Sequence, residues 1–174
     1  MSIKNLERAR IRKVRLDDAA AIWALEREIV MEGEFFIALP EEFNFTLEQQ
    51  QEQILDLLEN ERKTMLVAEM EGKVVGVIAF KSENLIRIAH TGSITMMINK
   101  DCRNMGLGKL LLKELLEWAD QNPFIEKVSL GVFSTNDRAI ALYKKMGFVE
   151  EGRKIKEFKI NDEYIDDILM CKFV

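Results

Sequence analysis

The chain has 174 residues and a formal net charge of −5, with 48% hydrophobic and 32% charged residues. This length and composition predict one globular domain over residues 1–174 and argue against a disordered chain. The acidic balance argues against a nucleic-acid partner, which would need a net basic face.

A strand and a helix open the predicted fold. Residues 9–14 alternate apolar and basic side chains, as a strand does. Asp17 and Asp18 then offer an N-cap for a helix that continues to about Met31. A loop over 33–45 follows, and its four phenylalanines predict that it packs against the protein.

A second helix and a hairpin come next. A capping-box pattern at Thr46 begins a helix that continues to about Glu61. Two β-rich runs, 63–70 and 73–81, are joined at a Glu-Gly turn that favours a hairpin. A further β-rich run covers 86–99.

The second half continues with a helix, a strand and another helix. Apolar periodicity predicts a helix over 107–119, and a β-rich run predicts a strand over 127–133. The next helix covers 136–146 and stops at Gly147.

The order of these elements predicts an α/β (α+β) fold. Two last runs, 148–160 and 164–173, form a closing hairpin. The strand at 94–99, the helix at 107–119 and the strand at 127–133 form a βαβ unit, whose strands are parallel. We therefore expect a mixed, mostly antiparallel central sheet with one parallel βαβ pair and flanking helices.

Residues that bind metals or form disulfides are few. The chain has two cysteines, Cys102 and Cys171, and one histidine, His90. We therefore expect no metal site and a reducing compartment. No apolar segment has the length of a membrane span, so we expect a cytoplasmic protein with no membrane partner. Carboxylates, tyrosine, backbone groups or water must carry any catalysis.

A glycine-bearing turn at 103–109, with the sequence RNMGLGK, lies between a predicted strand and a predicted helix. Glycines let the backbone approach a ligand closely, and a helix N-terminus offers free N–H groups to an anion. The turn matches neither the P-loop nor the dinucleotide fingerprint. A pyrophosphate is the expected ligand of this turn. The alternative is that its glycines serve only tight packing of the strand against the helix.

A second segment, over 134–148, begins the last helix. Asn136 is an N-cap candidate whose amide could also face a ligand. Ala139 and Tyr143 are four residues apart and share one helix face, which suits a channel wall. An ordinary capped helix with Tyr143 in the core is the alternative.

Together, RNMGLG at 103–108 and NDRAIALYKKMGF at 136–148 resemble the GNAT superfamily of acyltransferases. The resemblance implies transfer of an acetyl group from acetyl-CoA, the co-substrate, to a primary amine, with a small-molecule amine as acceptor. A protein or peptide N-terminal acetyltransferase and a non-catalytic acyl-CoA-binding sensor are the alternatives. Direct attack on the thioester needs no covalent enzyme intermediate, so Cys102 is expected to pack. A homodimer through the C-terminal strands is a further expectation.

The resemblance also implies the residues that bind acetyl-CoA. Backbone N–H groups of the glycine turn would hold the pyrophosphate, and the preceding strand would pair with the pantetheine arm after parting from the strand at 127–133. The implied binding residues are Met96, Met97, Ile98, Arg103, Asn104, Met105, Gly106, Leu107, Gly108, Lys109, Asn136, Ala139 and Tyr143.

For catalysis, the resemblance implies that Tyr143 protonates the departing thiolate. An alkyl amine is mostly protonated at pH 7, so the site must also remove a proton. Some relatives that modify protein N-termini carry a glutamate in a Leu-Glu-Val setting, where this chain has Leu130-Gly131-Val132. Our first choice for the base is Glu34, and Glu32, Glu83 and ordered water are the alternatives.

Overall fold

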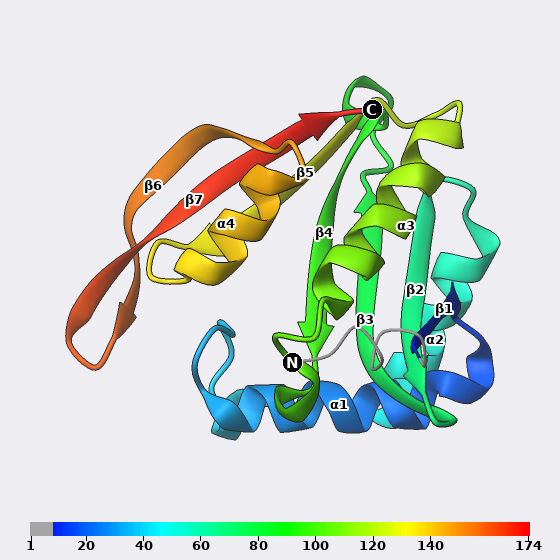
Figure 1. Cartoon of the computed structure of the whole chain (residues 1–174), viewed down its shortest axis with the longest axis horizontal. Helices are drawn as coiled ribbons and strands as arrows, with labels where there is room; N and C mark the ends of the chain where they lie inside the picture. Colours follow the sequence, from blue (N-terminus) through cyan, green and yellow to red (C-terminus); the bar gives the residue numbers. More distant parts are fainter. Residues whose placement is uncertain (1–8) are drawn as a thin grey trace.

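The computed structural model describes residues 9–174, which form one seven-stranded sheet with helices on both faces (Figure 1). The spatial order of the strands is β1-β2-β3-β4-β5-β7-β6. Neighbours are antiparallel except β4 and β5, which confirms the predicted mixed sheet with one parallel pair. The strands are β1 (Ala9–Lys13), β2 (Lys63–Met70), β3 (Lys73–Ser82), β4 (Thr91–Ile98), β5 (Lys127–Phe133), β6 (Val149–Ile160) and β7 (Glu163–Phe173).

Two cores lie on opposite faces of this sheet. Successive side chains of β3 alternate between them: Ile78 and Phe80 pack in the core with α3, while Val77 and Ala79 pack in the core with α1 and α2. The helices are α1 (Ala19–Glu32), α2 (Leu47–Glu59), α3 (Leu107–Gln121) and α4 (Asp137–Lys145).

Local capping and turn signals are confirmed at three places. The Thr46 hydroxyl accepts a hydrogen bond from the Gln49 N–H (3.3 Å), and α2 begins there. Glu71 and Gly72 have φ of 51° and 77° and join β2 to β3. Gly147, with φ of 89°, follows the end of α4.

The predicted strand over 86–99 is wrong at both of its ends. Ile86–Ile88 form a short 3₁₀ turn, and β4 covers only Thr91–Ile98. The side chain of Ile86 is 91% exposed. Leu85, directly before it, is 71% exposed, and without burial such an apolar run is not favoured as a strand.

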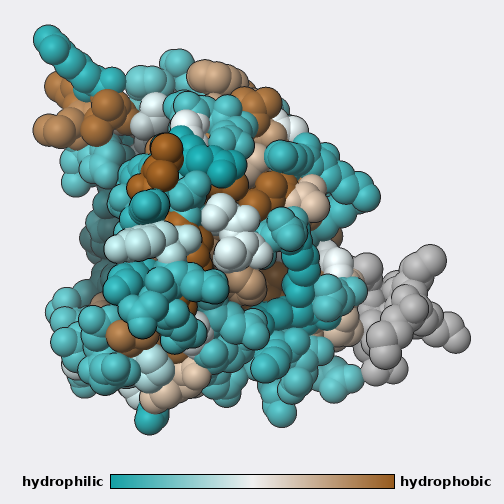
Figure 2. Space-filling view, turned by 90° about the vertical axis from the view of Figure 1, so that its left-hand side faces the viewer, coloured by the Kyte–Doolittle hydropathy of each residue, from teal (hydrophilic) through white to brown (hydrophobic). Residues whose placement is uncertain are grey.

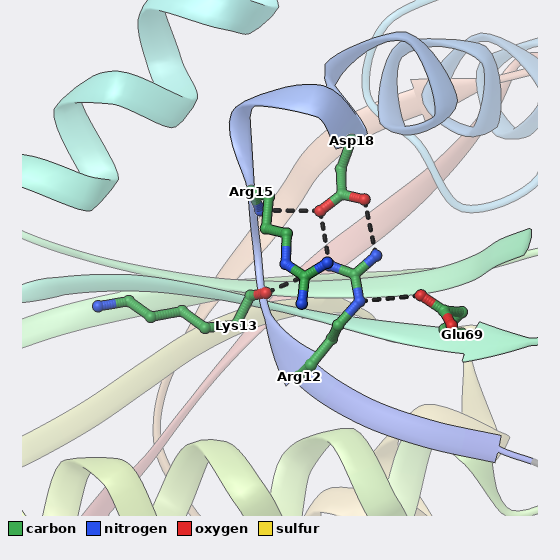
Figure 3. A network of polar contacts seen from close by, with 5 residues as sticks. All are labelled: Arg12, Lys13, Arg15, Asp18 and Glu69. Carbon is green, nitrogen blue, oxygen red and sulfur yellow. Dashed lines mark hydrogen bonds and ion pairs between the residues drawn. The ribbon is translucent and has the colours of Figure 1, made fainter. Parts of the chain in front are cut away.

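The helix-capping role predicted for Asp17 and Asp18 is also wrong. Asp18 stands directly before α1, but its side chain makes no capping hydrogen bond. Its carboxylate instead accepts hydrogen bonds from both terminal nitrogens of Arg12 (2.7 Å each) and from the Arg15 N–H (2.8 Å) (Figure 3). Arg12 also donates to Glu69 (2.9 Å), so this network ties β1 to β2 and to the start of α1.

Asp18→Asn is expected to lower the free energy of unfolding by about 1–3 kcal/mol at neutral pH, because a charge-assisted pair is lost. The Arg12 guanidinium, by hydrogen bonding, holds the pKa of Asp18 below its ordinary value in the folded protein. The contribution of Asp18 is therefore complete above about pH 4 and is lost as the pH falls through that lowered pKa.

Urea unfolding of the wild type and the variant across the acid range measures this difference, which should shrink as the pH falls. The control is Asp56→Asn, which removes an exposed ion pair with Lys63 and should cost no more than about 0.5 kcal/mol. An equal cost for both variants, or a difference that does not depend on pH, would contradict this account.

The side of the molecule formed by β6 and β7 is mostly hydrophilic, with separate hydrophobic patches (Figure 2). β6 is an edge strand of the sheet and carries two exposed apolar side chains, Val149 and Ile155. The homodimer through these strands stays a prediction, as does the single domain over residues 1–174.

Candidate active site

The parallel strands β4 and β5 separate partway along their length. They pair only where Thr91–Ser93 meets Lys127–Ser129. Beyond that point β4 continues beside β3, and β5 continues beside β7 (Figure 1). Within residues 9–174, the remaining part of β4 therefore has no strand partner on its β5 side, and this confirms the predicted parting of the two strands.

A cavity of about 900 Å³ occupies this opening. Clefts that hold a ligand of cofactor size have volumes of this order. Every residue expected to bind acetyl-CoA or to catalyse lines the cavity, with the exception of Met105. These lining residues are Glu34, Met96, Met97, Ile98, Arg103, Asn104, Gly106, Leu107, Gly108, Lys109, Asn136, Ala139 and Tyr143.

One end of the cavity is the turn between β4 and α3. Asn104 and Gly106 have positive φ of 63° and 88°, so the chain turns sharply there. α3 begins at Leu107, and the N–H groups of its first turn have no intrahelical acceptor. These groups and the positive end of the helix dipole can hold an anion.

Gly108 lets this first turn lie close to its neighbours. A Cβ at position 108 would be 3.3 Å from side-chain carbons of both Ile98 and Leu142. Gly108 thus lets the start of α3 pack closely against β4 and α4. For this glycine, the tight strand–helix packing considered above is confirmed.

Arg103 has partners within the protein. Its Nη1 lies 2.6 Å from the carboxylate of Glu32, and its Nε donates to the carbonyl of Ile98 (3.0 Å). The side chain thereby ties the last turn of α1 to the end of β4. The predicted contact of Arg103 with a pyrophosphate stays a prediction. Glu32, one of the candidate bases, is paired with Arg103.

Tyr143 lies on α4 and is 8% exposed. Its ring packs against Phe148, with 5.7 Å between the ring centroids. Burial raises the pKa of the phenol to about 12, so the hydroxyl keeps its proton at neutral pH. The phenol of Tyr143 is therefore in its protonated form, which can donate a proton.

Asn136 caps α4, as predicted. Its side-chain oxygen accepts a hydrogen bond from the Ala139 N–H (3.1 Å). Because Asn136 also lines the cavity, its amide nitrogen can still serve as a donor to a ligand.

Two carboxylates other than Glu32 bear on the choice of base. Glu34, on the loop after α1, is exposed and lines the cavity, whereas Glu83 is not among the lining residues. Asp167 of β7 also lines the cavity and is 8% exposed, and it was not among the residues predicted for the site. The available signal was a pair of adjacent aspartates, Asp166 and Asp167, between Ile165 and the apolar residues 168–170.

The aromatic loop after α1 divides its side chains between the cavity and Trp23 of α1. Phe35 and Phe36 line the cavity. Phe43 packs against Trp23, with 6.3 Å between centroids, and the Trp23 indole donates to the carbonyl of Phe45 (2.7 Å). The loop therefore packs, as predicted, and also forms one wall of the cavity.

The Cys102 thiol lines the cavity beside the turn. Burial, with a smaller effect from Asp101, raises its pKa. The thiol thus stays protonated at neutral pH and is a weak nucleophile. Within residues 9–174 there is no group of three His, Cys, Asp or Glu side chains placed to hold a metal, and no helix is long and apolar enough to cross a membrane.

Comparison with known proteins gives a family match and related enzymes. Residues 23–148 match the model of the acetyltransferase (GNAT) family. The chain is 32% identical over 107 residues to the L-amino acid N-acetyltransferase AaaT of Escherichia coli, covering 62% of this chain and 66% of that protein. It is 29% identical over 168 residues to an N-alpha-acetyltransferase of Sulfurisphaera tokodaii, covering 91% of this chain and 86% of that protein.

The fold also matches solved structures. The acetyltransferase of the GNAT family from Streptococcus pneumoniae has a TM-score of 0.91 and 29% identity, covering 95% of this chain and 99% of that one. The predicted fold class is therefore confirmed. The match to the Escherichia coli relative spans just under two thirds of that protein's length.

Proposed function

The chain belongs to the acetyltransferase (GNAT) family, and from this premise we propose that it is an acetyl-CoA-dependent N-acetyltransferase that acts on a small primary amine. The observation that carries the proposal is one continuous cavity. It joins the anion-binding turn before α3 to the buried phenol of Tyr143 and to the carboxylates of Glu34 and Asp167.

The turn and β4 bind the co-substrate, which supplies an acetyl thioester. The N–H groups at the start of α3 hold its pyrophosphate. The Asn99 N–H bonds to Val75 of β3, and successive strand residues point their backbone groups to opposite sides. The N–H groups of Ile98 and Met96 therefore face the opening, where they are available to the pantetheine amides and to the thioester carbonyl.

The reaction is direct attack of the amine on the thioester carbonyl. A backbone N–H near Ile98 polarises the carbonyl oxygen. The electron pair of the breaking C–S bond leaves on sulfur, and Tyr143 donates its proton there. A base takes a proton from the amine, which is mostly an ammonium ion at neutral pH.

The acceptor end of the cavity favours a cationic amine. Glu34 and Asp167 place negative charge there, and Phe35 and Phe36 provide apolar walls. The acceptor named for the Escherichia coli relative is an L-amino acid, which carries a primary amine. Acetylation of a protein or peptide N-terminus is the second candidate, because the Sulfurisphaera tokodaii relative, an N-alpha-acetyltransferase, matches 91% of this chain.

The test is CoA release from acetyl-CoA in the presence of amino acids, polyamines, aminoglycosides and short peptides. We expect amine-dependent release with a small amine and a product heavier by one acetyl group. The same compounds with the amine already acetylated are the controls. Release with peptides only would favour the second candidate, and binding of acetyl-CoA without any turnover would favour a sensor.

A further inference from the structure

The Asp167 residue lines the same cavity as the anion-binding turn. The residue is on β7, opposite Phe133 of β5, and is 8% exposed. Its neighbour Ile168 packs in the core with α3, so Asp167 lies on the other face of the sheet. The cavity therefore brings a buried carboxylate, Tyr143 and the loop after α1 together.

The space that this carboxylate fills is left open by a glycine. A Cβ at Gly131 would lie 2.7 Å from Asp167 Oδ1 and 3.2 Å from Oδ2. A side chain at position 131 would therefore collide with the carboxylate. Gly131 of β5 therefore leaves the space that the carboxylate of Asp167 of β7 occupies.

The charge of Asp167 has one ion-pair partner, Lys154 of β6. The Nζ of Lys154 lies 3.6 Å from Asp167 Oδ2 and is shared with Glu157, which it contacts at 3.2 Å. A carboxylate buried in this way is costly unless a donor reaches it, and the cavity is the open side.

The adjacent Asp166 shows the contrast. Its carboxylate accepts a hydrogen bond from the Lys156 N–H (2.8 Å) and one from Arg153 (3.3 Å), where β6 is irregular. Asp166 thus holds the β6 backbone and does not line the cavity. Asp167, by contrast, lines the cavity and pairs with the side chain of Lys154.

We propose that Asp167 is the general base of the acetyl transfer, an assignment that rests on the proposed function. It binds the acceptor ammonium and takes one proton from it, directly or through one water. The freed nitrogen lone pair forms the N–C bond, the C–S bond breaks, and Tyr143 protonates the sulfur. The nitrogen then loses its second proton, which restores the phenol through water, and Asp167 releases the first proton to solvent.

The first test compares Asp167→Asn with Asp166→Asn. Asp167→Asn is expected to lower kcat about 100-fold or more. Its Kd for acetyl-CoA, measured by calorimetry, should stay within about twofold of wild type, because Asp167 is on β7 and does not belong to the anion-binding turn. The control Asp166→Asn keeps an oxygen for the Lys156 N–H and should retain wild-type kcat.

The second test moves the carboxylate to the neighbouring strand. In the Asp167→Ala background, the added substitution Gly131→Glu places a carboxylate in the vacated space. The kcat of this double variant should be at least about tenfold higher than that of Asp167→Ala alone. The matched variant Gly131→Gln in the same background has the same shape without the charge and should recover nothing. The comparison of these two variants tests the role of the carboxylate even if Asp167→Asn does not fold.

An Asp167→Asn enzyme with wild-type kcat, or equal rates for the glutamate and glutamine variants, would overturn the base assignment while leaving the acetyltransferase intact. A wild-type protein that acetylates no amine at all would overturn the proposed function, and the assignment of Asp167 with it. The wild-type rate thus separates the two failures.

Discussion

Replacing Tyr143 by phenylalanine is expected to lower kcat by about 10²–10³-fold, the size of effect that a lost general acid produces. The Kd for acetyl-CoA should change by less than about twofold. Phenylalanine keeps the ring that packs against Phe148 and removes only the hydroxyl, so the variant should fold normally. Stopped-time assays of CoA release with saturating amine give kcat, and calorimetric titration gives the Kd.

The control for this variant is the other tyrosine of the chain. Tyr164 is exposed on β7 and is not part of the cavity, so Tyr164→Phe should keep wild-type kcat. The pKa of about 12 at Tyr143 adds a second expectation. Ionisation of this phenol should not reduce wild-type activity between about pH 8 and pH 10, because the donor form persists there. A Tyr143→Phe enzyme as fast as wild type would remove the proton-donor role.

The second large effect is expected on binding of acetyl-CoA and not on the chemical step. Gly106 has φ of 88°, a conformation that costs alanine about 1–2 kcal/mol. Gly106→Ala should shift the turn that presents the N–H groups of α3. Because hydrogen bonds from these groups to the pyrophosphate would be weakened, the Kd for acetyl-CoA should rise by about 10–100-fold. Calorimetric titration of both proteins measures this change.

Gly72→Ala is a matched control for backbone strain. Gly72 has φ of 77°, lies in the β2–β3 hairpin, and has nothing within 4 Å of an added Cβ. Both variants should lose about 1 kcal/mol of stability, because both force alanine into the left-handed region. Only Gly106→Ala should bind acetyl-CoA more weakly. Equal binding by both variants would show that the turn is not the pyrophosphate site.

Features set by neighbouring residues could be predicted from the sequence. The cap at Thr46, the hairpin at Glu71-Gly72 and the stop at Gly147 each depend on a few adjacent positions. The βαβ unit and the turn at 103–108 follow from periodicity and glycine spacing in the same way. The residues that the family resemblance implied for the site, Met105 excepted, line the cavity, and their roles stay predictions.

Contacts between distant segments could not be predicted. Arg103 stands beside the glycine turn, but the fold brings Glu32 of α1 to it. Asp167 reaches the cavity only because β7 pairs with β5 in a register that sets it beside Gly131. Nothing local to Gly131 reveals that its missing side chain makes room for an acid from another strand.

The central claim is that the amine attacks acetyl-CoA directly within this cavity. It is tested most directly by initial rates measured while acetyl-CoA and the best amine are varied together. Direct attack requires both substrates to be bound at once and predicts double-reciprocal lines that intersect. Parallel lines would indicate an acylated enzyme, for which Cys102 is the nucleophile in the cavity, and would contradict the account.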